Sequence, residues 1–260
     1  MKKSSFDRKL LAIPYAVFLA LFVIMPLIVI IYYGFTDGNG HVSFDNFIAF
    51  FTNSRTMGTL LYSLVIAVIV TLLCLLLAYP VAYILSKGVY ASKHSFLMVF
   101  VLPMWINFTL RITALKEILT LFEGNLAYHP FMNTIICMVY DFLPFMIMPL
   151  YTSLTKLDNS LLEAGADLYA DKWQRMIYVL LPLSVPGIVS GITMVFLPAM
   201  TNYVVLDMVY NSTYIMGSLI GSYFNFYDWN NGSIISAILL MFIGLFTVLT
   251  DRFVGNKEDA

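Results

Sequence analysis

Charged side chains are scarce in this chain. They make up 11% of its 260 residues, whereas 60% of the residues are hydrophobic and the mean hydropathy is +0.85. The core of a soluble protein of this length has no room for so much apolar surface. The composition therefore predicts an integral membrane protein, with lipid around it and no nucleic acid as a partner.

Residues that build catalytic and metal sites are also few. The two cysteines, Cys74 and Cys137, and the three histidines show neither C-x-x-C nor metal-ligand spacing. The chain has no G-x-S-x-G serine, and it lacks the Gly-Lys pair that a P-loop requires. We therefore expect no catalytic residue, no metal and no cofactor, and any ATP must be bound by another polypeptide.

Long apolar runs are abundant. About 20 apolar residues cross the hydrocarbon core of a bilayer. Six such runs occur, and they extend from Leu10 to Tyr33, Thr59 to Leu85, Phe96 to Leu115, Ile135 to Leu154, Ser184 to Leu206 and Ile234 to Phe253. The sequence predicts an all-α membrane protein, with six transmembrane helices in a single domain over residues 1–260.

The basic residues predict the orientation of these spans. With both termini in the cytoplasm, 11 of the 14 Lys and Arg residues lie inside and only Arg55 lies outside, as the positive-inside rule favours. Arg111 and Lys116 belong to the third span or its end. The inner residues are Lys2, Lys3, Arg8, Lys9, Lys87, Lys93, Lys156, Lys172, Arg175, Arg252 and Lys257.

A polar segment, called here the 155–182 loop, lies between the fourth and fifth spans. Ser160 and Glu163 match the S-x-x-E capping box, and Asp171 with Gln174 repeats a similar helix start. The loop is predicted to hold two short helices joined by a bend. Apolar residues at helical spacing give each helix a face to bury: Leu157, Leu161, Ala164 and Leu168, then Trp173, Met176, Ile177 and Leu180.

The first of these helices carries a pair of like charges. Glu163 and Asp167 lie four residues apart and weaken the isolated helix by about 0.2–0.5 kcal/mol. A cationic partner would remove this penalty. Two interpretations of Glu163 are open: it only caps its own helix, or it caps the helix and also binds a partner.

The loop contains Glu163-Ala164-Gly165, then Leu168, Ala170, Trp173 and Leu181-Pro182. These residues resemble the EAA loop of ABC importer permeases. The resemblance implies the type I permease fold, with residues 155–182 as a cytoplasmic coupling loop that docks on a separate ATPase. The coupling residues that it implies are Glu163, Ala164, Gly165, Asp167, Leu168, Tyr169, Trp173 and Pro182.

Two positions depart from the EAA pattern. Gly165 stands where a second alanine is usual, and Tyr169 stands where the pattern has glycine. Glycine enters the left-handed conformation that ends a helix without strain, whereas tyrosine enters it at a cost of about 1 kcal/mol or more. Either the turn differs here or the fold tolerates strain.

A second resemblance is carried by three further segments, which are Pro103 to Lys116, Leu143 to Tyr151, and Leu197-Pro198-Ala199-Met200 followed by Asp207. They resemble segments of the B-type permeases of spermidine/putrescine ABC importers. The resemblance implies uptake of polyamines, with a second, non-identical permease, an ATPase dimer and an extracellular polyamine-binding protein as partners. It also implies a bacterial inner membrane location. An importer of another small cationic or zwitterionic solute is the alternative.

A polycation pathway requires carboxylates and aromatic faces. Asp141 lies in the fourth span at about the depth of Arg111 in the third, so the two are expected either to form a structural ion pair or to leave Asp141 for the substrate. Asp207 either receives the cation or is an ordinary solvated acid. Trp105, Asn202 and Tyr203 are the other candidate pathway residues.

Two other classes of protein fit the composition. A secondary transporter would normally show coupling-ion sites or two repeated halves, neither of which is evident. A membrane enzyme would need a catalytic motif. The sequence therefore favours a transporter subunit without its own ATPase site.

Overall fold

The computed structural model describes residues 13–37, 40–88, 93–209 and 212–258. Two compact units account for the chain: Met1–Met57 with Leu219–Phe242, called unit 1, and Gly58–Ser218 with Ile243–Ala260, called unit 2. The described part is helical apart from turns and one isolated antiparallel bridge between Thr36 and Val42. The predicted all-α fold class is confirmed.

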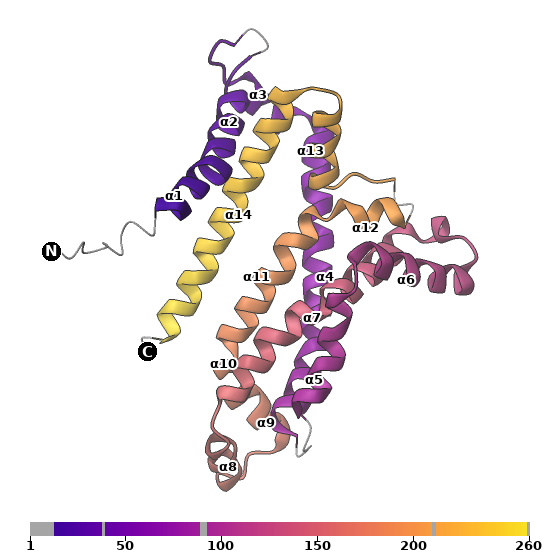
Figure 1. Ribbon diagram of the computed structural model, residues 1–260. Coiled ribbons are helices and arrows are strands. Elements are labelled where there is room, and N and C mark those ends of the chain that lie inside the picture. The colour runs from indigo at the N-terminus through magenta and orange to yellow at the C-terminus, as the bar shows by residue number, and fades with distance from the viewer. Residues whose placement is uncertain (1–12, 38–39, 89–92, 210–211, 259–260) are drawn as a thin grey trace, which may run out of the picture. The chain divides into compact units, whose positions relative to one another are not determined.

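Among the described residues, the helices follow one another along the chain and no sheet is present (Figure 1). Their bounds are α1 Ile13–Leu19, η2 Ala20–Ile24, α2 Met25–Gly34, α3 Asp45–Thr52, α4 Ser54–Lys87, α5 Lys93–Val101, η3 Leu102–Trp105, α6 Phe108–Glu123, η4 Leu126–Tyr128, α7 Pro130–Lys156, α8 Ser160–Asp167, α9 Lys172–Arg175, η5 Met176–Leu180, α10 Leu181–Leu183, α11 Val185–Thr201, α12 Tyr203–Met208, α13 Met216–Asn225 and α14 Trp229–Glu258.

Four predicted spans are single helical stretches long and apolar enough to cross a membrane: Ile13–Gly34, Ser54–Lys87, Pro130–Lys156 and Trp229–Thr250. Residues 10–12 of the first predicted span lie outside the described residues. The other two spans are bent helix pairs, so the described part of the chain provides up to six spans if each pair crosses once. The prediction of six spans holds on that count.

The third span bends by 103° between Phe96–Trp105 and Phe108–Glu123. Pro103 carries no backbone N–H and sits in the η3 turn, and Ile106 is extended. The side chain of Asn107 then starts α6 afresh by accepting a hydrogen bond from the Thr109 N–H at 2.9 Å. The predicted span from Phe96 to Leu115 is therefore a bent pair of helices.

The fifth span is bent by 67° before Val185 and ends earlier than predicted. Its helix α11 stops at Thr201, because Asn202 leaves helical geometry with φ −75° and ψ 81°. Tyr203 then begins the separate short helix α12. The predicted bounds of this span, Ser184 to Leu206, are corrected accordingly.

Wide π turns precede two of the prolines. The Leu181 N–H bonds to the Met176 carbonyl before Pro182, and the Met25 N–H bonds to the Ala20 carbonyl before Pro26. A proline ring crowds the carbonyl four residues back and offers it no N–H. Each π turn accommodates that conflict without ending the helix.

In unit 1, side-chain amides hold the turn that follows α2. Asn46 of α3 and Asn230 of α14 donate to backbone carbonyls there, with Asn46 Nδ2 2.9 Å from the Thr36 oxygen and Asn230 Nδ2 3.0 Å from the Tyr33 oxygen. The short helix α3 buries Phe50. These bonds satisfy carbonyls that the end of α2 leaves without a helical partner.

The core of unit 2 is the contact between α7 and α11, which run side by side (Figure 1). Gly187 and Gly191 of α11 face α7 at G-x-x-x-G spacing. A Cβ atom at Gly187 would lie 2.5 Å from the Ser153 Cβ, and one at Gly191 would lie 2.5 Å from the Met146 sulfur. The close backbone approach expected from this spacing is present.

We predict that Gly187→Ala destabilises the protein. The added methyl group has no room beside Ser153 and the Pro149 carbonyl, and overpacking of this kind costs about 1–3 kcal/mol. The measurement is the thermal denaturation temperature of the purified, detergent-solubilised protein. Gly244→Ala is the matched control, because a Cβ atom there meets nothing within 4 Å. Equal denaturation temperatures for the two variants would contradict the packing argument.

Candidate functional site

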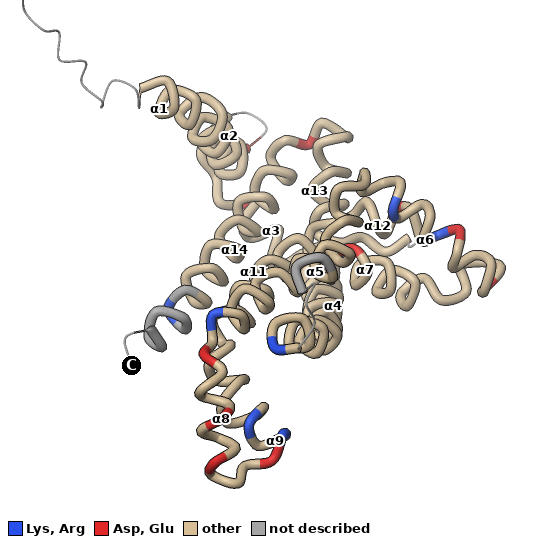
Figure 2. The backbone as a smooth tube through the Cα atoms, turned by 60° about the horizontal axis from the view of Figure 1, so that its bottom comes forward, with Lys and Arg blue, Asp and Glu red and all other residues tan. Residues whose placement is uncertain are grey.

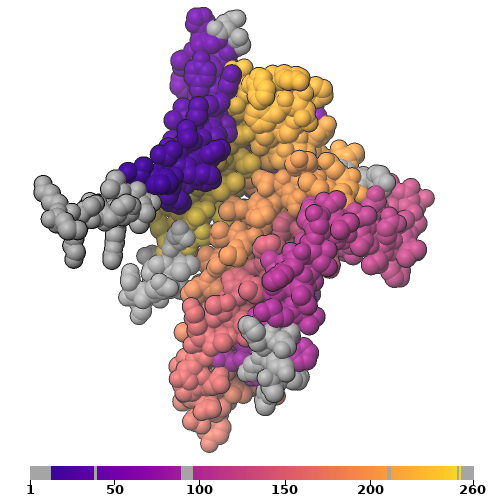
Figure 3. Space-filling model, in the orientation of Figure 1, coloured from indigo at the N-terminus to yellow at the C-terminus, as the bar shows by residue number. Residues whose placement is uncertain are grey.

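The 155–182 loop forms one end of unit 2, beyond the ends of α7 and α11 that it connects (Figures 1 and 3). It contains the two predicted helix starts, now α8 and α9, followed by η5 and α10. Charged residues gather on α8 and α9, whereas the neighbouring spans carry few (Figure 2). The predicted bend between two short helices is confirmed.

The caps of the two helices differ from each other. Asp171 and Gln174 form the complete predicted capping box, with the Gln174 N–H 2.7 Å from Asp171 Oδ1 and the Asp171 N–H 2.9 Å from Gln174 Oε1. The box predicted for Ser160 and Glu163 is wrong. Ser160 is already the first residue of α8, and its N–H donates to Asp158 Oδ1 at 3.0 Å.

The faces of the two helices stay largely uncovered within this chain. Glu163, Ala164 and Asp167 are exposed, as are the bulkier side chains at the bend, of which Leu168 is 82% and Tyr169 98% accessible. Trp173 is 70% exposed. Among the described residues, no group donates a hydrogen bond to the side-chain carboxylate of Glu163. Its carboxylate is therefore free for a partner and does not act as a helix cap.

Tyr169 adopts the left-handed conformation that the resemblance assigns to glycine, with φ +56°. The Tyr169 N–H bonds to the Ala166 carbonyl at 2.9 Å, and the Ala170 N–H bonds to the Gly165 carbonyl at 3.1 Å. These two bonds define the Schellman motif that commonly ends helices. The turn is thus the ordinary one, and the fold tolerates a strained tyrosine in it.

Gly165 provides the contact between the two short helices. It is buried, and a Cβ atom on it would lie 3.1 Å from Cγ and 3.3 Å from Cδ of Arg175. Arg175 lies across α8 and donates from Nη1 to the Leu162 carbonyl at 3.3 Å. Glycine instead of the usual alanine lets the arginine stem pass close to the α8 backbone.

Arg111 and Asp141 meet in the interior of unit 2. Nη2 of Arg111, on α6, donates to Oδ1 of Asp141, on α7, and the two residues are 7% and 3% exposed. The structure therefore contains the structural ion pair, one of the two roles expected for Asp141. Nε and Nη1 of Arg111 are buried without a hydrogen-bond partner among the described residues.

The other predicted pathway residues are distributed over two breaks. Trp105, 84% exposed, lies at the bend between η3 and α6. Asn202, Tyr203 and the exposed Asp207 lie at the break after α11 and on α12, which packs on α6 and α7. The structure thus brings α12 against the two helices that carry the ion pair, while Trp105 lies at the other break.

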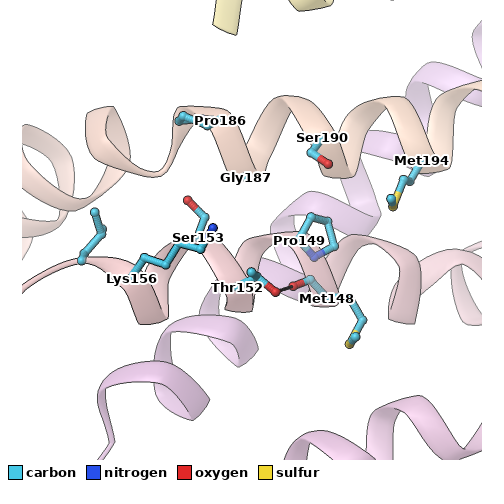
Figure 4. Close-up of a pocket in the computed structure, with 10 residues that line it drawn as sticks. Met148, Pro149, Thr152, Ser153, Lys156, Pro186, Gly187, Ser190 and Met194 are labelled. Atoms are coloured by element: carbon cyan, nitrogen blue, oxygen red, sulfur yellow. Dashed lines mark hydrogen bonds between the residues drawn. The ribbon is translucent and has the colours of Figure 1, made fainter. Parts of the chain in front are cut away.

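A groove that the sequence did not predict lies between α7 and α11. Its volume is about 520 Å³, and its lining includes Ser153 and Lys156 of α7 and Ser190 and Met194 of α11 (Figure 4). Gly187 and Ser153, which meet at the close contact of the two helices, both line this groove. Sequence periodicity could not reveal it, because its two walls come from helices separated by the 155–182 loop.

Residues 92–258 match the family described as the binding-protein-dependent transport system inner membrane component. The chain belongs to this family. It is 35% identical over 96% of its length to the spermidine/putrescine transport system permease protein PotB of Salmonella typhimurium, covering 94% of that protein. The protein of the same name from Escherichia coli is 36% identical over 77% of this chain and 80% of its own length.

Chains from solved structures of ABC transporters share the fold. A chain from the bacterial alginate ABC transporter in complex with an alginate-bound periplasmic protein superposes with a TM-score of 0.74, at 13% identity, over 94% of this chain and 92% of the other. A second alginate importer structure gives a TM-score of 0.69 at 14% identity, over 94% of both chains. The type I permease fold is thereby confirmed for this inner membrane component.

We predict that Tyr169→Gly stabilises the 155–182 loop of this permease. Glycine removes the left-handed strain, which is worth about 1 kcal/mol or more. Amide hydrogen exchange at Ala170, whose N–H closes the Schellman motif, should slow in the variant. Tyr169→Phe keeps the strain and removes only the hydroxyl group, so its exchange should match that of the wild type. Faster exchange in Tyr169→Gly would contradict the strain argument.

We predict that Asp141→Leu alone prevents stable assembly, because it leaves the buried Arg111 cation unpaired at a cost of about 3–5 kcal/mol. Arg111→Met together with Asp141→Leu should restore assembly, since a hydrophobic pair replaces the ion pair. The measurement is the yield and denaturation temperature of purified permease. A double variant no more stable than the single one would show that the two residues do not act as a pair.

Proposed function

We propose that this chain is a permease subunit of an ATP-driven importer of polyamines, spermidine and putrescine. The observation that carries the proposal is its similarity, over nearly its full length, to permeases named for spermidine and putrescine transport. The 155–182 loop supports the same proposal from the structure, because it presents two exposed short helices that the chain itself does not cover.

The proposed complex contains a second, non-identical permease, a cytoplasmic ATPase dimer and an extracellular polyamine-binding protein. No P-loop is present in this sequence, so ATP is bound by the ATPase and this chain has no cofactor of its own. The basic residues favour both termini and the 155–182 loop on the cytoplasmic side of the bacterial inner membrane.

Docking on the ATPase is assigned to the exposed surface of α8 and the following bend. Glu163 and Asp167 are like charges on one helix and form no salt bridge with any described residue, so a basic groove on the ATPase would offset their repulsion. Leu168, Tyr169 and Trp173 supply the apolar contact area. Ala164, Gly165 and Pro182 complete the residues that we assign to coupling.

The substrate residues are proposed from charge and exposure. Asp141 is already neutralised by Arg111, which favours its structural role over contact with the polycation. Asp207 is an exposed carboxylate, and Trp105 and Tyr203 offer aromatic faces, each worth about 0.5–2 kcal/mol to an ammonium group. Asn202 would add a polar contact at the break beside Tyr203.

The test is uptake of labelled spermidine into vesicles that hold the whole complex, with ATP and the binding protein supplied. We expect uptake that requires ATP and that unlabelled putrescine reduces. Competition by other small cationic or zwitterionic solutes, without competition by polyamines, would overturn the substrate. Uptake by this chain without the ATPase would overturn the importer mechanism and indicate a secondary transporter.

In the same vesicles, we predict that Glu163→Lys abolishes spermidine uptake while membrane insertion stays unchanged. The reversed charge opposes a basic groove on the ATPase, so ATP hydrolysis should no longer respond to the loaded binding protein. Glu117→Lys, a charge reversal outside the 155–182 loop, is the control for a general charge effect. Normal uptake by Glu163→Lys would remove this residue from the docking surface.

A further inference from the structure

Lys87, the last residue of α4, binds the start of the 155–182 loop. Its Nζ donates to the backbone carbonyl of Leu157 and to Oδ1 of Asn159, the latter at 3.0 Å. Leu157 is the C-cap of α7, and Asn159 is the N-cap of α8. One ammonium group therefore spans the whole connection between α7 and α8.

Both acceptors suit a cation. The carbonyl of Leu157 belongs to the end of α7, where helical carbonyls lack partners and the helix dipole is negative. Between the two acceptors lies Asp158. Hydrogen bonds from Ser160 hold the pKa of its carboxyl below the usual value, and the charge of Lys87 lowers it further. The connection thus presents a negative environment that Lys87 occupies.

A second contact joins α4 to the other end of the loop. The Tyr79 hydroxyl lies 3.1 Å from Oγ of Ser184, the residue that follows α10 and precedes α11. Tyr79 and Lys87 are eight residues apart on α4, which is about 12 Å along the helix axis. The same helix therefore holds the loop where it begins and where it ends.

We propose that Lys87 is a positioning residue of the importer, which fixes α8 to α4 so that a displacement of α8 by the ATPase also moves α4. This inference rests on the proposed function, because it assumes that α8 is the surface on which the ATPase acts. Through its bonds to Leu157 and Asn159, Lys87 connects the start of the docking helix α8 to a full-length span.

The experiment compares Lys87→Met and Lys87→Arg in the whole reconstituted complex. Lys87→Met keeps the apolar stem and removes the charge, so the ratio of spermidine transported to ATP hydrolysed should fall about tenfold, within the usual range of coupling between sites. Lys87→Arg retains a cationic donor and should recover most of that ratio. Arg252→Met, which removes an exposed cation of α14, is the control and should leave the ratio unchanged.

Amide hydrogen exchange of the permease gives a readout that does not depend on the substrate. Exchange over residues 157–167 should become about tenfold faster in Lys87→Met and stay near the wild-type rate in Lys87→Arg. If wild-type complex takes up no spermidine, the proposed substrate fails while this comparison still tests Lys87. Unchanged exchange and an unchanged transport ratio in Lys87→Met would overturn the inference.

If the complex with Lys87→Met does not assemble, Asn159→Ala tests the same link from the acceptor side. It removes one acceptor and leaves the cation bound to the Leu157 carbonyl, so it should weaken coupling in the same direction by a smaller factor. Thr155→Ala, a nearby change of an exposed side chain at the end of α7, is its control. An Asn159→Ala complex with wild-type exchange and coupling would count against the proposed link.

Discussion

The close contact of α7 and α11 is the constraint on which the loop between them depends. Glycines at 187 and 191 let the two backbones approach, and any larger residue there meets Ser153 or Met146. Since α7 leads into the 155–182 loop and α11 leaves it, this contact brings both ends of the loop together. The loop is therefore held as a compact projection with its two short helices exposed.

Within that projection, two unusual residues preserve an ordinary backbone. Tyr169 takes the left-handed position of a Schellman turn in spite of its side chain, because two backbone hydrogen bonds and the following capping box at Asp171 fix the bend. Gly165 has no side chain, so the aliphatic part of Arg175 can pack against the backbone there. The two departures from the family pattern change how the loop is packed, and they leave its path unchanged.

The charged residues of unit 2 include two contrasting groups, a buried ion pair in the interior and exposed carboxylates elsewhere. The buried Arg111 and Asp141 neutralise each other, as the cost of an isolated charge in an apolar medium requires. Glu163, Asp167 and Asp207 remain exposed and are thus available for other molecules. This division separates residues that hold the bundle together from those proposed to face the ATPase or the substrate.

The sequence by itself determined the helical membrane class, the number of apolar stretches and the place of the two short helices, because hydrophobic runs and capping patterns are local. It also placed Arg111 and Asp141 at similar depths. Only the tertiary structure decided that the third span bends by 103°, that Ser160 does not cap α8, and that Lys87 reaches Leu157. These outcomes depend on competition among alternative hydrogen-bond partners and on contacts between residues about 70 positions apart, neither of which a local pattern records.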